Sequence, residues 1–165
     1  MRSLALLPLL LVAACSEGDS APAPEKAPAD TTMEAGQWET TTEVTRLTKL
    51  DGGAPAIDTP AGTKSSFTSC VAETDRKKPA ATLFAGDKAD CEYNDFYMSR
   101  GRITASMTCE MPGIQGGLVT SVEGSNDATS FEGTLSSSTR LPGAGDVRIA
   151  SKISGRKIGA CPAAA

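Results

Sequence analysis

The stretch that decides the fold is residues 91–109, CEYNDFYMSRGRITASMTC. Polar and apolar side chains alternate along both of its halves, as in a strand with one buried face. The halves flank the sequence SRG at 99–101, a turn signal, because glycine readily adopts a positive φ. Opposing Cys91 and Cys109 brings the apolar side chains of both halves onto one face. The stretch therefore predicts a β-hairpin with a disulfide between these two cysteines.

This register fixes which side chains share the apolar face of the hairpin: Cys91, Tyr93, Tyr97, Ile103, Ala105, Met107 and Cys109. In it, Tyr97 faces Ile103 and Tyr93 faces Met107. Asp95 also turns toward the apolar face, opposite Ala105. A buried carboxylate needs a partner. We therefore expect Asp95 to pair with Arg102 or Arg148, or else to lie beside a water-filled cleft.

The other cysteines favour a second disulfide. The chain has five cysteines and no histidine. Cys15 belongs to an N-terminal motif discussed below, so Cys70 and Cys161 remain and pair by exclusion. A zinc site is disfavoured because there is no Cys-x-x-Cys pair and the gaps between cysteines are long and uneven. We expect no metal and no cofactor.

A period of two extends outward from the hairpin in both directions. It predicts strands over 37–44, 64–71, 118–124, 130–138 and 146–154. The apolar parity of the first strand shifts at Leu47, which predicts a bulge near Thr45-Arg46. Residues 51–62 form a loop, and the only helical candidate is a short one after Pro79. The predicted fold is mainly β, a curved antiparallel sheet or half-barrel with at most one short helix.

The N-terminus has the pattern of a bacterial lipoprotein signal. Arg2 precedes an apolar run, and LVAAC at 11–15 ends it with small residues and a cysteine. We expect cleavage after residue 14 and a lipid on Cys15, which would be the contact with the membrane. By what the lipoprotein class implies, Ser16 favours the periplasmic face of the outer membrane over retention in the inner membrane.

These signals divide the chain into four parts. Residues 1–14 are the lipoprotein signal peptide, and 15–32, rich in Ala and Pro, are a lipidated disordered tether. Residues 33–161 are a single β domain of a size that supports one core. Residues 162–165 are a frayed tail.

Charge and composition exclude several functions. The formal net charge is −4, or −5 once Arg2 is removed with the signal peptide. An acidic domain with few aromatic residues is a poor candidate for binding nucleic acid. Without histidine there is no Ser-His or Cys-His pair, and we expect no catalytic residues and no enzyme activity. The acidic residues Asp87, Asp90, Glu92 and Asp95 lack the spacing of a calcium loop and read as solvated strand edges.

Some of these residues resemble a known family. AGQWE at 35–39, Cys70 and Cys91, FEG at 131–133 and ISGRKIGAC at 153–161 are similar to the bacterial exported and lipoprotein family catalogued as domain of unknown function 3617. The resemblance implies a small secreted or lipid-anchored β domain. It implies no known activity, so it assigns no catalytic residue.

Two functional hypotheses follow. In the first, the protein is a binding module that holds a small apolar ligand or a peptide on the concave face of the sheet, with Trp38, Tyr93 and Met107 as tentative ligand-binding residues. In the second, it is an inhibitor of another envelope protein or an assembly accessory, with the loop 51–62 making the contact. A cavity lined by the three residues would favour the first hypothesis, and a packed core with a protruding loop would favour the second.

Overall fold

The computed structural model describes residues 32–53, 59–112, 117–141 and 145–163. In this part of the chain, seven antiparallel strands form one sheet in the order β2-β1-β7-β6-β5-β4-β3. The strands are β1 (Gly36–Lys49), β2 (Lys64–Val71), β3 (Asp90–Ser99), β4 (Arg102–Glu110), β5 (Leu118–Asn126), β6 (Ser130–Leu141) and β7 (Gly145–Gly159). A 3-10 turn, η1 (Glu73–Asp75), and a helix, α1 (Thr82–Ala85), lie between β2 and β3. The predicted fold class is confirmed.

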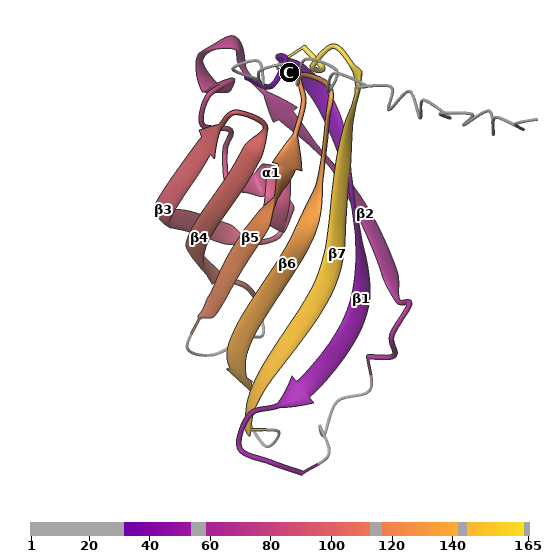
Figure 1. Cartoon of the computed structure of the whole chain (residues 1–165), viewed down its shortest axis with the longest axis vertical. Coiled ribbons are helices and arrows are strands. Elements are labelled where there is room, and N and C mark those ends of the chain that lie inside the picture. The colour runs from indigo at the N-terminus through magenta and orange to yellow at the C-terminus, as the bar shows by residue number, and fades with distance from the viewer. Residues whose placement is uncertain (1–31, 54–58, 113–116, 142–144, 164–165) are drawn as a thin grey trace, which may run out of the picture.

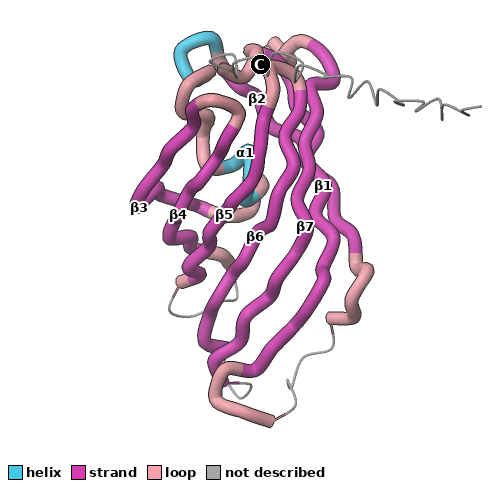
Figure 2. The backbone as a smooth tube through the Cα atoms, in the orientation of Figure 1, coloured by secondary structure: helices cyan, strands magenta, loops and turns pink. Residues whose placement is uncertain are grey.

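The sheet curls into a half-barrel (Figure 1). Its two edges are β2 and β3, and the crossing segment (residues 72–89), which connects them and carries α1, passes over the concave side (Figure 2). Long antiparallel strands twist strongly, so a sheet of this kind curls rather than staying flat. Its apolar inner face must be covered, and the crossing segment supplies part of the cover.

The predicted bulge in the first strand is confirmed. The register between β1 and β7 shifts between Val44 and Arg46, which makes Thr45 an extra residue. Before the bulge Val44 faces Ser151, and after it Leu47 faces Ile149. The extra residue therefore moves the inward positions of β1 from even to odd numbers and bends the strand along the curve of the sheet.

The register of the β3–β4 hairpin was predicted correctly at the end that carries the cystine and wrongly toward the turn. Cys91 faces Cys109 and Tyr93 faces Met107, but the register shifts between Tyr93 and Asp95. A bulge therefore lies at Asn94. Every residue of β3 beyond it occupies the face opposite to the predicted one, whereas Ile103 and Ala105 of β4 face inward as predicted.

The turn explains the shift. Arg100 and Gly101 both have positive φ, 53° and 74°, which is the geometry of a two-residue hairpin turn. The turn and the cystine impose strand registers that differ by one residue. The extra residue of the bulge accommodates this difference. Phe96, facing Ala105, is the inward residue. The expectation that Tyr97 lies on the apolar face opposite Ile103 was wrong, and Tyr97 is 52% exposed.

Asp95 is corrected for the same reason. Its side chain is exposed, and its strand partner is Ser106 rather than Ala105. Among the described residues, no ion pair joins Asp95 to Arg102 or Arg148. Arg148 instead donates a hydrogen bond to Ser138, at 3.2 Å.

The core fills one end of the concave face. Phe131 lies at its centre, with its ring 6.0 Å from that of Trp38 in a stacked arrangement and 5.3 Å from that of Phe84, edge to face. Gly155 faces Phe131 across β6 and β7. A side chain at Gly155 would overlap the Phe131 ring, so the close approach requires a glycine.

Both predicted disulfides are present. Cys91–Cys109 joins residues 18 apart within the hairpin, and Cys70–Cys161 joins residues 91 apart. The second bond ties the segment after β7 to the edge strand β2. In the chain-entropy model, closing these loops contributes about 3 and about 5 kcal/mol, respectively.

The predicted strand boundaries are right for β2 and short for β7. β2 matches the predicted 64–71, whereas β7 continues to Gly159, five residues past the predicted end at 154. Residues 1–31 and 164–165 lie outside the described residues, and with them the predicted signal peptide, Cys15 and nearly all of the tether. So do 54–58 within the predicted loop, 113–116, and 142–144 in the turn after β6.

Candidate functional site

The three residues proposed from the sequence as ligand contacts lie in the core. Trp38 and Met107 are fully buried, and Tyr93 is half-buried. The Trp38 indole N–H donates to the Glu34 carbonyl, at 3.1 Å. None of the three lines any of the hollows described below. The cavity lined by these three residues that would have favoured the first hypothesis is therefore not found in the described part of the chain, and any ligand site must consist of other residues.

Tyr93 has a structural task, because it helps to hold the crossing segment in place. Its hydroxyl donates to the Pro79 carbonyl, at 2.9 Å, and burial raises the pKa of the phenol, which keeps it protonated. On the other side, the buried Thr40 hydroxyl donates to the Leu83 carbonyl, at 2.8 Å. Leu83 and Phe84 are themselves fully buried. The crossing segment is thus fixed to the sheet from both sides.

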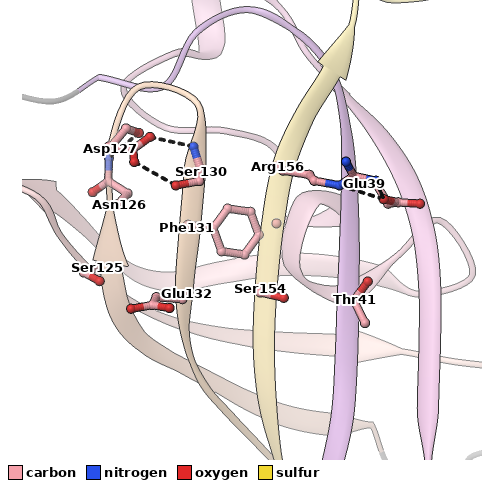
Figure 3. Close-up of a pocket in the computed structure, with 11 residues that line it drawn as sticks. Glu39, Thr41, Ser125, Asn126, Asp127, Ser130, Phe131, Glu132, Ser154 and Arg156 are labelled. Carbon is pink, nitrogen blue, oxygen red and sulfur yellow. Dashed lines mark hydrogen bonds and ion pairs between the residues drawn. The ribbon is translucent and has the colours of Figure 1, made fainter.

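A polar hollow of about 440 Å³ lies on the convex face beside the β5–β6 turn (Figure 3). Three of its four charged groups, those of Glu39, Asp127 and Arg156, are held by contacts within the described part of the protein, and the fourth, Glu132, is exposed. Arg156 forms an ion pair with Glu39, at 2.7 Å. The Asp127 carboxylate accepts from the backbone N–H groups of Thr129 and Ser130, both at 2.7 Å, and these bonds lower its pKa. These contacts stabilise the turn and the sheet, and we assign no ligand to this hollow.

A second cavity, of about 340 Å³, lies on the concave face beside the core. Its floor is the sheet, with Thr42, Phe67, Leu118, Thr120, Leu135 and Ser137. The opposite wall is the crossing segment from Phe84 to Ala89, and Met111 closes one side. The cavity therefore lies where the part of the half-barrel filled by α1 ends.

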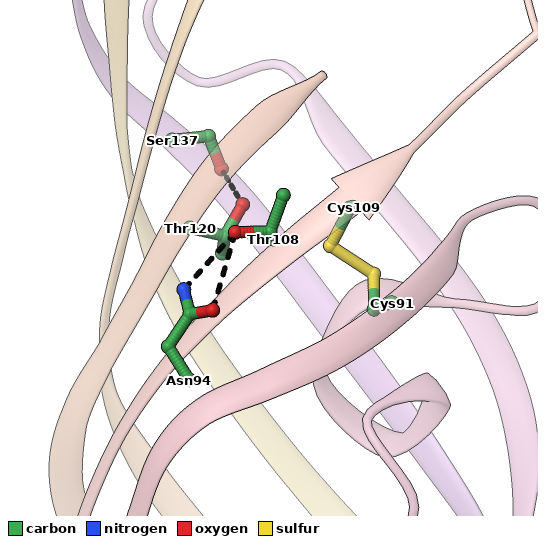
Figure 4. The surroundings of a disulfide bond; sticks show 6 residues. All are labelled: Cys91, Asn94, Thr108, Cys109, Thr120 and Ser137. Carbon is green, nitrogen blue, oxygen red and sulfur yellow. Dashed lines mark hydrogen bonds between the residues drawn. A yellow bond between two sulfur atoms is a disulfide. The ribbon is translucent and has the colours of Figure 1, made fainter.

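Hydroxyl groups supply the polar part of the floor. Thr120 is 2% exposed, and its hydroxyl lies 3.0 Å from that of Ser137 on the neighbouring strand (Figure 4). Because each hydroxyl can be the partner of the other, neither needs a ligand to be satisfied. Apart from the Thr42 hydroxyl the remaining floor is apolar, with Phe67, Leu118 and Leu135 half-buried. Such a surface favours an apolar ligand with few polar groups.

The only titratable side chains among the described residues lining the cavity are Asp87 and Lys88. Both are exposed at its mouth. The mouth adjoins a larger hollow, with Asp87, Lys88, Ala89 and Met111 lining both spaces. An apolar chamber thus opens past charged residues to the surface.

The sequence located the strands of this floor but gave no reason to single out Phe67, Leu118 or Leu135. These residues can contact a ligand because they lie beyond the part of the concave face that α1 covers, and this depends on where α1 ends. The loop 51–62, the basis of the inhibitor hypothesis, is described only in part.

Within the described ranges, no helix has the length and apolar character needed to cross a membrane. The family model described as "Protein of unknown function (DUF3617)" matches residues 33–161, which confirms the resemblance seen in the sequence. No curated protein and no solved structure matches the chain.

Proposed function

This chain belongs to the DUF3617 family of proteins of unknown function, and we propose that it is a non-enzymatic binding protein for a small apolar ligand. The ligand occupies the cavity between α1 and the concave face of the sheet. The observation that carries the proposal is this cavity of about 340 Å³, at the small end of the range of ligand sites in proteins. That size suits one alkyl chain or a small ring system better than a peptide.

The walls of the cavity support binding because they are fixed before a ligand arrives. The floor is a sheet whose strands pair along their length, and the hydrogen bonds from Thr40 and Tyr93 fix the crossing segment at Leu83 and Pro79, before the opposite wall begins at Phe84. Binding to a preformed site loses little conformational entropy. An apolar ligand would also cover the half-buried Leu118 and Leu135.

The chemistry of the lining supports a non-enzymatic role. Hydrolysis or group transfer needs a nucleophile beside a base, or a pair of titratable groups with separated pKa values. Among the described lining residues, the hydroxyls of Thr120 and Ser137 bond to each other, and the acid and the amine lie only at the mouth. This arrangement suits retention of a ligand.

We further propose that the domain acts at the cell envelope as a lipoprotein. The support is the motif at 11–15 and the acidic, Pro-rich segment after it. Replacing Cys15 by serine should abolish labelling by a palmitate analogue and leave an uncleaved precursor. Undiminished label in this variant would disprove lipidation at Cys15.

Binding can be tested with the neutral fluorescent probe N-phenyl-1-naphthylamine on the delipidated domain. We expect the probe to bind and become brighter as it leaves water. Leu135→Trp, which fills the cavity from the floor, should weaken binding at least tenfold. Thr134→Trp places the same side chain one residue away on the exposed face of β6 and should leave binding unchanged.

A second blocking variant separates loss of the cavity from loss of the fold. Ala85→Phe fills the cavity from the opposite wall, at the end of α1. The parent and both blocking variants should unfold cooperatively. Probe binding that survives both substitutions in folded protein would disprove the proposed site.

A further inference from the structure

The mouth of the cavity is acidic. The hollow onto which it opens is lined by three carboxylates, those of Asp87, Asp90 and Glu110, and by one ammonium group, that of Lys88. All four side chains are exposed. In the described part of the chain, none of them forms an ion pair. The local charge is therefore negative, and it is not neutralised from within the domain.

Two of these carboxylates break a rule of strand pairing. Asp90 and Glu110 are direct partners across β3 and β4, next to the inward pair Cys91–Cys109, so their side chains leave the convex face side by side at this end of the sheet. The hollow that they line reaches from there to the cavity mouth at Ala89 and Met111. Like charges directly opposite each other destabilise a pair of strands. The adjacent pair is the cystine Cys91–Cys109, which holds the strands together against this repulsion. Departures from local consistency of this kind tend to mark functional positions.

The opposite side of the cavity does not show this imbalance. There the lining residues from β2, Ser65, Ser66 and Phe67, are uncharged. The negative potential is therefore concentrated at the end of the cavity where Ala89 and Met111 line both spaces. A charge at this mouth selects the ligands that approach it.

We infer that the ligand is a cationic amphiphile, with its apolar part in the cavity under α1 and its ammonium group beside Asp90 and Glu110. This inference rests on the proposed function, because it identifies the class of ligand for the same cavity. An organic cation fits better than a metal ion, since the described residues contain no group of three or more side chains placed to hold a metal.

The test is competition against bound N-phenyl-1-naphthylamine by three ten-carbon compounds, decylamine, decanol and decanoate, below the concentrations at which they aggregate. Each exposed charge contact is worth up to about 1 kcal/mol. Decylammonium should therefore displace the probe at about three- to tenfold lower concentration than decanol. Decanoate should be the weakest. The preference should shrink as salt is raised, since the carboxylates are exposed.

Two double variants that each remove two carboxylates test whether the preference for decylammonium arises at this mouth. Asp90→Asn with Glu110→Gln removes both carboxylates with little change of shape and should abolish the preference for decylammonium. Glu92→Gln with Asp95→Asn removes the same charge from exposed positions of β3 that do not line the hollow, and should retain the preference.

The outcomes separate the two proposals. If the probe does not bind the parent protein, the proposed function fails. If the probe binds but decylamine and decanol compete equally, the cavity stands and the cationic ligand is disproved. If both double variants lose the preference equally, net charge rather than this mouth is responsible, and the inference is overturned.

Discussion

Replacing Gly155 by alanine should destabilise the domain by crowding Phe131. Gly155 is buried and directly opposite Phe131 across β6 and β7. A Cβ at this position would lie 2.9 Å from Cδ1 of the Phe131 ring and closer still to Cε1 and Cζ. Ordinary contacts between carbon atoms are about 3.5 to 4.0 Å. The ring must therefore move by an ångström or more.

The size of the effect depends on whether the ring can move. Phe131 is 4% exposed. Its ring is stacked on that of Trp38 and makes an edge-to-face contact with that of Phe84. Overpacking of such a site costs about 1 to 3 kcal/mol. At a permissive position, by contrast, Gly→Ala stabilises by about 0.4 to 1 kcal/mol. We expect a net loss of roughly 1 to 2 kcal/mol.

Urea and thermal unfolding of the domain with its disulfides intact would measure this loss. For a domain of this size, 1 kcal/mol corresponds to roughly 3 to 5 °C in melting temperature. Gly159→Ala is the matched control. It lies on the same strand, and nothing lies within 4 Å of the added Cβ. Its stability should stay the same or rise slightly.

A second substitution tests the cause. Phe131→Leu in the Gly155→Ala background shortens the crowded side chain, so the two changes together should cost less than the sum of their separate effects. If Gly155→Ala is as stable as Gly159→Ala, or if the two changes add without coupling, the packing of Phe131 does not explain why this position is a glycine.

Two further predictions concern the covalent and electrostatic supports of the fold. Replacing Cys70 and Cys161 by alanine should destabilise the domain more than replacing Cys91 and Cys109, because the first pair closes a loop of 91 residues and the second one of 18. Denaturant midpoints would give the order, about 5 against about 3 kcal/mol in the chain-entropy model, and the reverse order would contradict loop closure as the dominant cause. Asp127 should contribute stability that is complete above its ordinary pKa of 3.8 and is lost as the pH falls through its lowered folded value. Asp127→Ala should therefore lower the melting temperature at pH 7 and change it little at pH 2, and an equal loss at both pH values would disprove the role of its charge.

The strands were predictable because one face of the sheet is turned inward, with side chains that are buried or half-buried along most of its length. That condition imposes the alternation read from the sequence, and it located β2 to the residue. It also revealed the bulge in β1, where the apolar parity changes at Leu47. The end of β7 was missed because Gly155 faces inward without a side chain. The alternating pattern therefore has no apolar side chain at this inward position.

The hairpin register could have been read better from the same sequence. Asn94 and Asp95 are two consecutive polar residues between the aromatic residues Tyr93 and Phe96, a break in alternation that is the mark of a bulge. The ion pair expected for Asp95 followed entirely from the missing bulge. The cavity had no comparable signal, because it depends on the distance between segments far apart in the sequence.

The cavity results from the point at which α1 stops. Gly86 ends the helix with φ 81°, a conformation that disfavours other residues, and its N–H donates to the Thr82 carbonyl at 3.0 Å. A helix of four residues carries Leu83 and Phe84 into one end of the half-barrel and leaves the floor beyond Phe67 without cover from a helix. The short helix therefore leaves an open apolar surface on a rigid sheet, which is the condition that a binding site requires.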